Sequence, residues 1–409
     1  MASTSFMLPP QTDFRKHIKS ECSKRSKLLH TTIFGTAFSS SDEFLVGVSS
    51  DGRMIVWDLG ARTGITSSSS DCTYDGDSVN TKKRKTEDTL NCKPCFEFQV
   101  CDGALYDVQF VPKSNGESLL LACGDEGIFL YDDFLSSLKS EESINFKIPA
   151  AKSQLRPNLN SYGSMFPAEF NRISYDSSSG QLFGAAGDGC GYIWDIHTSQ
   201  LVGNLGHKNP TKRSYSDCLH AIKVIEADSN APCHGCVLTG GEGILSMWSG
   251  KDRKLIDTFD CTATGGSHSK NGKKHNRQKC WISSIDVDDT GDWSVIGGGR
   301  SSKSTGGFLQ LFNLHSRSIM SSTFQETVET IHDVAYHPTG ILSVGNDGVV
   351  SSWPSLNLTQ GRTGRAWGSS PASYSISVHP ENGMVATGNV SSSVDCFTEY
   401  LTKTCTLTR

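Results

Sequence analysis

Residues Ile331 to Trp353, IHDVAYHPTGILSVGNDGVVSSW, contain the pattern that decides the fold of this chain. Polar and apolar side chains alternate over IHDVAYH, as they do in a strand with one buried face. A second apolar stretch, ILSVG, ends near Asp347-Gly348, a pair that is typical of tight hairpin turns. A third stretch ends at Trp353. The segment therefore predicts three consecutive antiparallel strands joined by short turns.

The same order of strand, turn and aromatic residue occurs seven times along the chain. The aromatic residues that end the third strands are Trp57, Tyr131, Trp194, Trp248, Phe312, Trp353 and Phe397. The last two intervals match the repeat of about 40–45 residues of one propeller blade. The earlier intervals are longer because segments are inserted between strands. A blade is apolar on both faces and is stable only when it packs against other blades, and seven copies close into a ring.

The sequence therefore predicts an all-β fold, a seven-bladed WD-repeat β-propeller over residues 30–409. The expected blade cores are 30–59, 95–132, 168–197, 216–250, 280–315, 328–355 and 372–409. The alternating tail at 402–408, TKTCTLT, is expected to form the outer strand of the last blade. The alternative is a β-sandwich with coincidental turns, and seven copies in register argue against it. Five aromatic residues are expected to be buried anchors of their blades: Trp57, Trp194, Trp248, Phe312 and Trp353.

Several segments do not fit the blade pattern. Residues 1–29 are polar and basic, and they predict an N-terminal arm or helix. Residues 60–94, 137–167 and 261–279 lack the apolar content of a core and are expected to be flexible surface loops. The run Gly297-Gly298-Gly299 is interpreted as a loosened turn.

The composition limits the class of protein. The chain has 409 residues and a net charge of −5, so its whole surface is not basic enough to be a nucleic-acid footprint. No apolar stretch reaches the roughly 18 residues of a membrane span, and the N-terminus lacks the apolar core of a secretory signal. We therefore expect a cytosolic or nuclear protein whose 14 cysteines are reduced.

Motifs for chemistry are weak in this sequence. The Cys-x-x-Cys pairs Cys92/Cys95 and Cys233/Cys236 lie too far apart in the chain for a paired zinc motif. No P-loop, dinucleotide fingerprint, HExxH or GxSxG motif is present. His207, Thr239 and Trp248 are interpreted as a structural network within the fourth blade. No catalytic, cofactor-binding or metal-ligating residues are therefore predicted, and a propeller enzyme is the least favoured class.

One basic tract indicates where in the cell the protein is located. Lys82, Lys83, Arg84 and Lys85 are consecutive, and four adjacent cations favour an extended, exposed segment. Nuclear-import receptors bind such tracts, so the four residues are a candidate nuclear-import signal. The alternative is a solvated loop that no receptor binds. A second basic tract at 273–277 is a weaker candidate for nonspecific contact with phosphate backbones.

The local sequence of the blades resembles the THO complex subunit 6 family. The most specific stretches are HTTIFGTAFSSSDEFLVGVSSDG (30–52), CWISSIDVDDTGDWSVIGGG (280–299), GILSVGNDGVVSSW (340–353) and VDCFTEYLTKTCTLT (394–408). The resemblance covers nearly the whole propeller, and the Ser- and Lys-rich loops look plant-type. It implies a non-enzymatic scaffold without cofactors in a nuclear complex that couples transcription to mRNA processing and export. The implied partners are other THO subunits, particularly coiled-coil ones, with RNA contacted indirectly, no membrane, and more than one copy in the assembly.

Plant relatives are also associated with cullin-4-type RING ubiquitin ligases as substrate receptors, including in abscisic-acid responses. That role uses a Trp-Asp-x-Arg box whose Arg contacts the ligase adaptor. The matching residues here are Trp194, Asp195 and His197, so His replaces the expected Arg. A histidine is mostly uncharged at neutral pH and cannot form the bidentate hydrogen bonds of arginine. The ligase role is therefore the alternative function, and it could coexist with the first.

Overall fold

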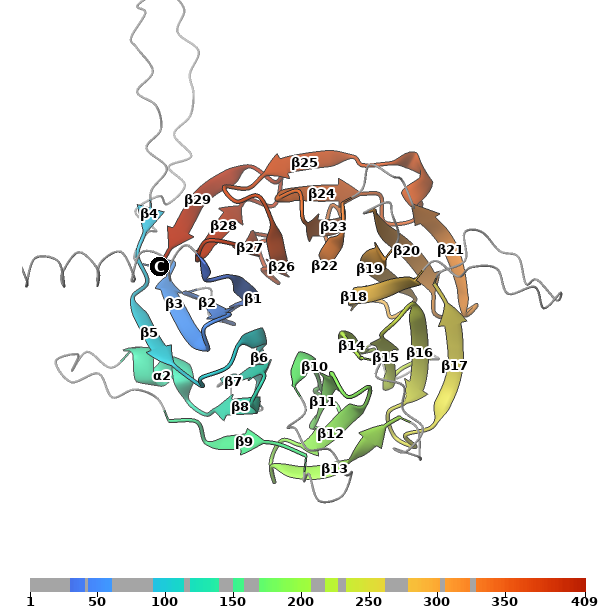
Figure 1. Ribbon diagram of the computed structural model, residues 1–409, viewed down its shortest axis with the longest axis horizontal. Helices are drawn as coiled ribbons and strands as arrows, with labels where there is room; N and C mark the ends of the chain where they lie inside the picture. Colours follow the sequence, from blue (N-terminus) through green and yellow to red (C-terminus); the bar gives the residue numbers. More distant parts are fainter. Residues whose placement is uncertain are drawn as a thin grey trace, which may run out of the picture.

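The computed structural model shows a ring of seven β-sheets arranged as blades around a central channel (Figure 1). It describes residues 30–40, 43–60, 91–113, 118–139, 150–157, 169–206, 218–226, 233–261, 279–301, 306–323 and 329–409. The predicted seven-bladed β-propeller is confirmed. The N-terminal arm predicted at 1–29 lies outside the described residues.

Each blade contains four antiparallel strands in chain order, and the sheet of the last blade has a fifth strand that comes from an earlier part of the chain. The first blade contains β1 (Ile33–Phe38), β2 (Phe44–Ser49), β3 (Arg53–Asp58) and β5 (Phe96–Gln99). The second contains β6 (Leu105–Pro112), β7 (Ser118–Gly124), β8 (Gly127–Tyr131) and β9 (Ser153–Leu155). The third contains β10 (Phe170–Asp176), β11 (Gln181–Ala186), β12 (Gly191–Asp195) and β13 (Gln200–Leu205). The fourth contains β14 (Ala221–Val224), β15 (Cys236–Gly240), β16 (Ile244–Ser249) and β17 (Leu255–Asp260).

The remaining blades follow the same antiparallel order. The fifth contains β18 (Lys279–Val287), β19 (Trp293–Ser301), β20 (Gly307–Asn313) and β21 (Ser318–Thr323). The sixth contains β22 (Ile331–His337), β23 (Gly340–Gly345), β24 (Val349–Trp353) and β25 (Gly364–Trp367). The seventh contains β26 (Ser373–Val378), β27 (Val385–Asn389), β28 (Ser393–Phe397) and β29 (Lys403–Thr408), and β4 (Asn91–Cys92) pairs in parallel with β29. Two short helices, α2 (Phe134–Lys139) and η4 (Leu358–Gln360), lie in connections.

The outer strands differ most from the sequence prediction. Strand β29 forms the outer strand of the last blade, as the alternating tail predicts. In contrast, β5 belongs to the first blade, although residues from 95 onward were assigned to the second blade core. Strand β9 lies within 137–167, a range that the sequence predicts as an inserted loop. Strand β9 has one apolar residue and so lacks the alternation that identifies a strand, whereas β5 alternates but carries no sign of the blade to which it belongs.

The core consists of apolar clusters between neighbouring blades. The side chains of Trp57, Trp194, Phe312 and Trp353 are at most 1% exposed, so they are buried as the repeat predicts. Trp248 is only partly buried, and its Nε1 donates a hydrogen bond to Thr239 Oγ1 at 2.9 Å. His207, the third residue of the network predicted there, lies outside the described residues.

The run Gly297–Gly299 lies within β19, so its interpretation as a loosened turn is wrong. The glycines are required by close packing instead. A Cβ atom at Gly297 would come within 2.6 Å of Val334 Cγ1 in the sixth blade. A Cβ atom at Gly298 or Gly299 would overlap Trp281 of the neighbouring strand β18. Glycine in a strand interior often marks such a close approach of backbone or side chains.

The first and last blades are joined by strand pairing as well as by side chains, because β4, which lies between β3 and β5 in the chain, pairs in parallel with β29. A β-bridge joins Thr32 to Val390, and Thr36 Oγ1 lies 3.0 Å from Ser377 Oγ. The end of β29 lies beside the first blade (Figure 1). There Arg409 Nη1 lies 2.8 Å from Asp51 Oδ2, and Arg409 Nη2 lies 2.8 Å from Glu97 Oε1. The Arg409 side chain is 10% exposed, whereas its partners Asp51 and Glu97 are 38% and 22% exposed, so the guanidinium is shielded from water and the carboxylates are partly open to it.

Replacing Arg409 with Ala is expected to lower the free energy of unfolding by about 2 kcal/mol, because two carboxylates lose a charge-assisted hydrogen-bond donor. The measurement is urea unfolding followed by tryptophan fluorescence. The matched control is Arg156→Ala, which removes an exposed ion pair to Glu126 within the second blade. An exposed pair contributes only about 0–1 kcal/mol. Equal losses from the two variants would contradict a closing role for Arg409.

Candidate docking sites on the ring

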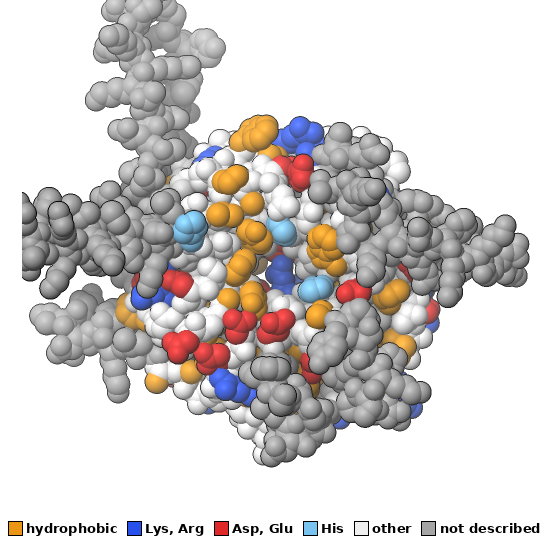
Figure 2. All heavy atoms as spheres, viewed as in Figure 1, with side chains coloured by type: hydrophobic (Ala, Val, Ile, Leu, Met, Phe, Trp, Pro, Cys, Tyr) orange, Lys and Arg blue, Asp and Glu red, His pale blue; other side chains and the backbone are white. Residues whose placement is uncertain are grey.

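Six residues with the same position in their blades surround one mouth of the central channel. Each lies at the beginning of the innermost strand or directly before it: Phe34, Tyr106, Asn171, His220, His332 and Tyr374. In the fifth blade Ser283 takes this position, and Trp281 lies beside it. We call these eight residues the aromatic collar. Figure 2 views this face and shows hydrophobic and histidine side chains gathered around the centre.

The side chains of the collar contact one another around the mouth. The ring centroids of Phe34 lie 5.6 Å from Tyr106 and 5.3 Å from Tyr374, the second pair edge to face. His332 stacks on Tyr374 at 4.4 Å. These aromatic side chains remain partly exposed. The mouth of the channel is therefore a concave, mostly aromatic surface with a cavity of about 220 Å³.

Both histidines of the collar are held uncharged at neutral pH. Burial lowers the pKa of His220, although Glu242 opposes the shift. Burial also lowers the pKa of His332, whose Nε2 lies 2.6 Å from Asn346 Oδ1. A neutral imidazole behaves as a further aromatic ring with one donor and one acceptor. The collar therefore adds no positive charge to the mouth at pH 7.

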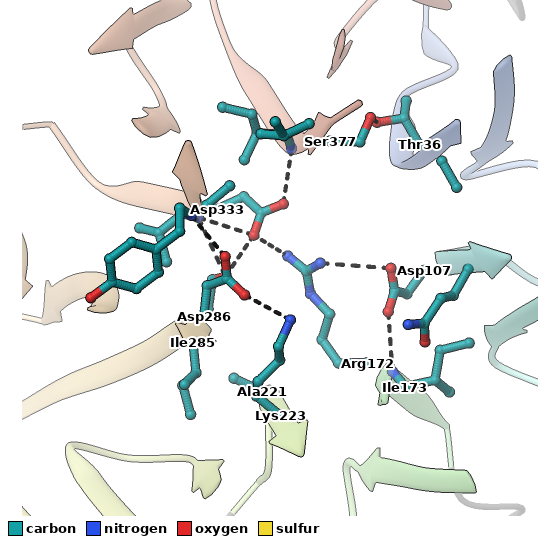
Figure 3. Close-up of a pocket in the computed structure, with 18 of the residues that line it drawn as sticks. Thr36, Asp107, Arg172, Ile173, Ala221, Lys223, Ile285, Asp286, Asp333 and Ser377 are labelled. Atoms are coloured by element: carbon teal, nitrogen blue, oxygen red, sulfur yellow. Dashed lines mark hydrogen bonds and ion pairs between the residues drawn. The ribbon is translucent and has the colours of Figure 1, made fainter. Parts of the chain in front are cut away.

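The middle of the channel contains five charged side chains, one from each of five innermost strands (Figure 3). They are Asp107, Arg172, Lys223, Asp286 and Asp333. Arg172 Nη2 lies 2.6 Å from Asp333 Oδ1, and its Nη1 lies 3.6 Å from Asp107 Oδ1. Lys223 Nζ lies 2.7 Å from Asp286 Oδ1. The five groups carry two positive and three negative formal charges and bridge blades that are not adjacent in the ring.

The three carboxylates of the channel also bind the backbone of the following blade. Asp107 Oδ2 accepts from Ile173 N at 3.1 Å, and Asp333 Oδ2 accepts from Ile376 N at 2.9 Å. Asp286 Oδ2 accepts from Tyr336 N at 2.7 Å. Because each carboxylate is engaged by a cation and an N–H group, the cluster joins blades and has few free lone pairs for a ligand.

The pKa values of the channel groups follow from burial and from their partners. Burial raises the pKa of Asp107, while Arg172 opposes this shift. Burial lowers the pKa of Arg172, but Asp333 and Asp107 outweigh this effect and the net shift is upward. Asp286 raises the pKa of Lys223. Both cations therefore stay charged at any physiological pH.

A second cavity, of about 420 Å³, lies on the other side of this charged cluster. Figure 3 shows the side chains that line it, with Thr36 and Ser377 from the first and last blades beside Asp107 and Arg172. Arg172 therefore lies between the two mouths of the channel.

The three residues predicted to dock on a ligase adaptor differ in their exposure and in their contacts. Trp194 is 1% exposed and packs against Phe170 at a centroid distance of 5.4 Å, so it belongs to the core. Asp195 Oδ1 accepts the N–H groups of His197 and Thr198, both at 2.9 Å. The hydrogen bond from Thr198 lowers the pKa of Asp195. Of the three residues only His197 is exposed, and Asp195 orders the turn that presents it.

The other sequence-predicted groups are not brought together in the described part of the chain. The import tract Lys82, Lys83, Arg84 and Lys85 lies outside it. Cys95 is exposed in the first blade, whereas Cys233 lies in the fourth blade, where its Sγ donates to Leu314 O at 3.5 Å. Within the described residues no three His, Cys, Asp or Glu side chains group as metal ligands. None of the described helices is long and apolar enough to cross a membrane.

The collar was missed by sequence reasoning. Its members are aromatic, histidine, asparagine or serine residues, and each appears in the sequence only as one residue in an alternating strand. The signal that could have found them is a register shift in the innermost strand. In six blades the collar residue is the one that the shift skips, as Phe34 is between Ile33 and Gly35. Aligning the seven repeats at that position would have placed them side by side.

Comparison with known proteins gives one relative across nearly the whole chain. No protein-family model matches the sequence. The chain is 27% identical over 405 residues to a protein of Arabidopsis thaliana named THO complex subunit 6. The match covers 94% of this chain and 94% of the relative. The resemblance to the THO complex subunit 6 family is therefore confirmed by a similarity that spans the whole ring.

Proposed function

Because the chain is similar to a THO complex subunit along nearly its whole length, we propose that it is itself a subunit of a nuclear THO complex. In this proposal it acts as a non-enzymatic scaffold in mRNA processing and export, with other THO subunits as its partners. The observation that carries the proposal is the 94% coverage of both chains at 27% identity. A similarity confined to one blade would reflect only the repeat, whereas this one includes all seven blades.

The geometry of the ring is compatible with a scaffold role. A closed propeller leaves only short, protected sheet edges and presents a rigid surface of loops and strand ends. In the channel, Arg172 and Lys223 are bound by carboxylates of the chain itself. Rigid surfaces with engaged internal charges suit binding to other proteins better than they suit proton transfer.

The test is affinity purification of the tagged full-length chain from nuclear extract, with mass spectrometry of what remains bound. We expect other THO subunits, coiled-coil subunits among them, in fixed ratio to the chain. A tag-only purification and the Trp353→Ala variant, in which a buried anchor is removed, are the controls for nonspecific recovery. Recovery of the folded chain without any THO subunit would contradict the proposal, even if a cullin adaptor were present.

The ubiquitin-ligase alternative gains no support from the geometry. Trp194 is buried and Asp195 is engaged by its own turn, which leaves His197 as the exposed part of the predicted motif. The name of the relative refers to the THO complex and to no ligase. The scaffold role is therefore the function that we propose.

Nuclear localisation is a separate prediction that rests on the sequence. Changing Lys82, Lys83, Arg84 and Lys85 together to Ala is expected to shift a fluorescent fusion toward the cytoplasm, because the receptor-binding charges are removed. The control changes the basic residues of the second tract, Lys273, Lys274 and Arg277, to Ala. An unchanged nuclear signal in the first variant would show that import depends on another segment or on a partner.

A further inference from the structure

The aromatic collar is bordered by negative charge on the side of the second and third blades. Asp125 follows β7, and its Oδ1 accepts a hydrogen bond from Tyr106 of the collar at 2.8 Å. Glu169 directly precedes β10 and is exposed. Neither carboxylate forms an ion pair with a cation in the described part of the chain. Figure 2 shows acidic side chains on this face next to the central hydrophobic group.

The two carboxylates lie close enough to influence each other. Glu169 is exposed as a residue, but its carboxyl group is partly desolvated, which raises its pKa, and the charge of Asp125 raises the pKa further. Burial also raises the pKa of Tyr106, and its hydrogen bond to Asp125 adds to the shift. The contribution of Asp125 to both shifts indicates that its negative charge reaches the edge of the collar.

The charged cluster beneath the collar does not reverse this potential. Arg172 is the one cation among the residues that line the mouth, and two carboxylates, Asp107 and Asp333, lie against its guanidinium. The two collar histidines are uncharged at neutral pH. A cation that enters the mouth therefore meets aromatic rings, the acidic pair and a guanidinium that is already compensated.

The mouth has the size of one side chain. Its cavity of about 220 Å³ is smaller than the roughly 300–1,000 Å³ of pockets for drug-sized ligands. Aromatic faces attract Lys and Arg side chains, and each such contact contributes about 0.5–2 kcal/mol. The ring of aromatic side chains surrounds the entry from several blades, so a long side chain can enter along the channel axis while its backbone stays on the surface.

We propose that the aromatic collar, with Asp125 and Glu169, binds a basic segment of a partner protein by taking one Arg or Lys side chain into the mouth of the channel. This proposal rests on the proposed scaffold function in one respect: that function is the reason to expect a protein as the partner. The site itself is defined by the collar geometry and by charge complementarity. A Lys or Arg side chain can bind to these aromatic rings without a third molecule.

The test is a titration of the purified full chain with a blocked glycine–serine peptide that contains one central arginine. The reporter is the indole N–H signal of Trp281, identified by its loss in Trp281→Phe, because nuclear magnetic resonance detects binding even at millimolar affinity. A matched peptide with citrulline keeps the shape of arginine without its charge. We expect the arginine peptide to bind about tenfold more tightly than the citrulline peptide.

Two variants and one control locate the effect. The double variant Asp125→Asn/Glu169→Gln keeps both shapes and removes both charges, and it is expected to weaken arginine-peptide binding about tenfold. Tyr374→Leu keeps an apolar side chain but removes a π-face, and it is expected to weaken binding severalfold. Glu381→Gln removes one exposed charge at the turn between β26 and β27, at the opposite end of the innermost strand, and should leave binding unchanged.

The outcomes separate this proposal from the proposed function. Equal affinity for the arginine and citrulline peptides, or for wild type and the double variant, would overturn the cation site. The same holds if the Trp281 signal responds to single-stranded RNA and to neither peptide. The titration uses the purified chain alone. Its result therefore does not depend on whether THO subunits co-purify with the chain.

Discussion

Replacing Asp333 with Ala is expected to lower the free energy of unfolding by about 3–5 kcal/mol, the range for breaking a buried ion pair by removing one partner. The Asp333 side chain is 3% exposed. Its Oδ1 accepts from Ser284 Oγ and from Arg172 Nη2, both at 2.6 Å, and its Oδ2 accepts from Ile376 N at 2.9 Å. One carboxylate thus joins the third, fifth, sixth and seventh blades. Its loss leaves Arg172 with Asp107 alone.

A double-mutant cycle isolates this pair from the effect of lost packing. Urea unfolding of Asp333→Ala, Arg172→Ala and the double variant gives three losses of stability. Removing both partners avoids the uncompensated charge, so the double variant should lose clearly less than the sum of the single variants. Asp333→Asn is expected to fall between wild type and Asp333→Ala, because the amide oxygen still accepts hydrogen bonds. Additive losses would show that the pair is not coupled.

The second large effect is expected for Trp353→Ala, which should also cost about 3–5 kcal/mol, the usual range for deleting a buried large aromatic side chain. Trp353 is 1% exposed and packs in the cluster that contains Val295, Leu311 and Ile341. Its Nε1 donates to Ser343 Oγ at 2.9 Å, and the guanidinium of Arg362 lies 5.3 Å from its ring. The cost combines the lost transfer free energy with the cavity left behind.

The controls for this prediction are two further tryptophan variants. Trp353→Phe keeps most of the packing and removes the indole N–H, so a loss nearer about 1–2 kcal/mol is expected. Trp367 is 70% exposed at the rim of the sixth blade, and Trp367→Ala should change stability by no more than about 0.5 kcal/mol. A loss below about 1 kcal/mol in Trp353→Ala would contradict its role as a buried anchor. All three are measured by urea unfolding with circular dichroism.

The blade anchors could be predicted because the buried position in each blade is occupied by an aromatic residue that recurs along the sequence. An aromatic residue ends the third strand of every repeat, and Asp-Gly turns at 51–52, 188–189 and 347–348 place glycines at the positive φ angles that these turns need. The outer strands left no such mark. Strand β9 has three residues, and only Leu155 among them is buried. Packing of the run Gly297–Gly299 depends on Trp281 and Val334, contacts that come from a neighbouring strand and the next blade.

The candidate site was less predictable than the fold for a related reason. The collar consists of single residues spaced a blade apart, and what they share is a position in three dimensions. The charged channel likewise depends on Arg172 reaching Asp333 from a blade on the other side of the ring. In the sequence these two residues lie in separate strands with no common motif. A pattern search along the chain detects neighbours within a strand and cannot detect partners across a ring.

The closure of the ring has a consequence for how the chain is made. The four antiparallel strands of each blade follow one another in chain order, so each blade can pair these strands before the next blade is synthesised. Contact between the first and last blades must wait until β29 and Arg409 have left the ribosome. Until then the apolar face of β1 and β2 lacks its neighbour Val394 and Leu407. The nascent protein is therefore an open crescent with one uncovered apolar face at each end, and these two faces become buried only when the last blade is complete.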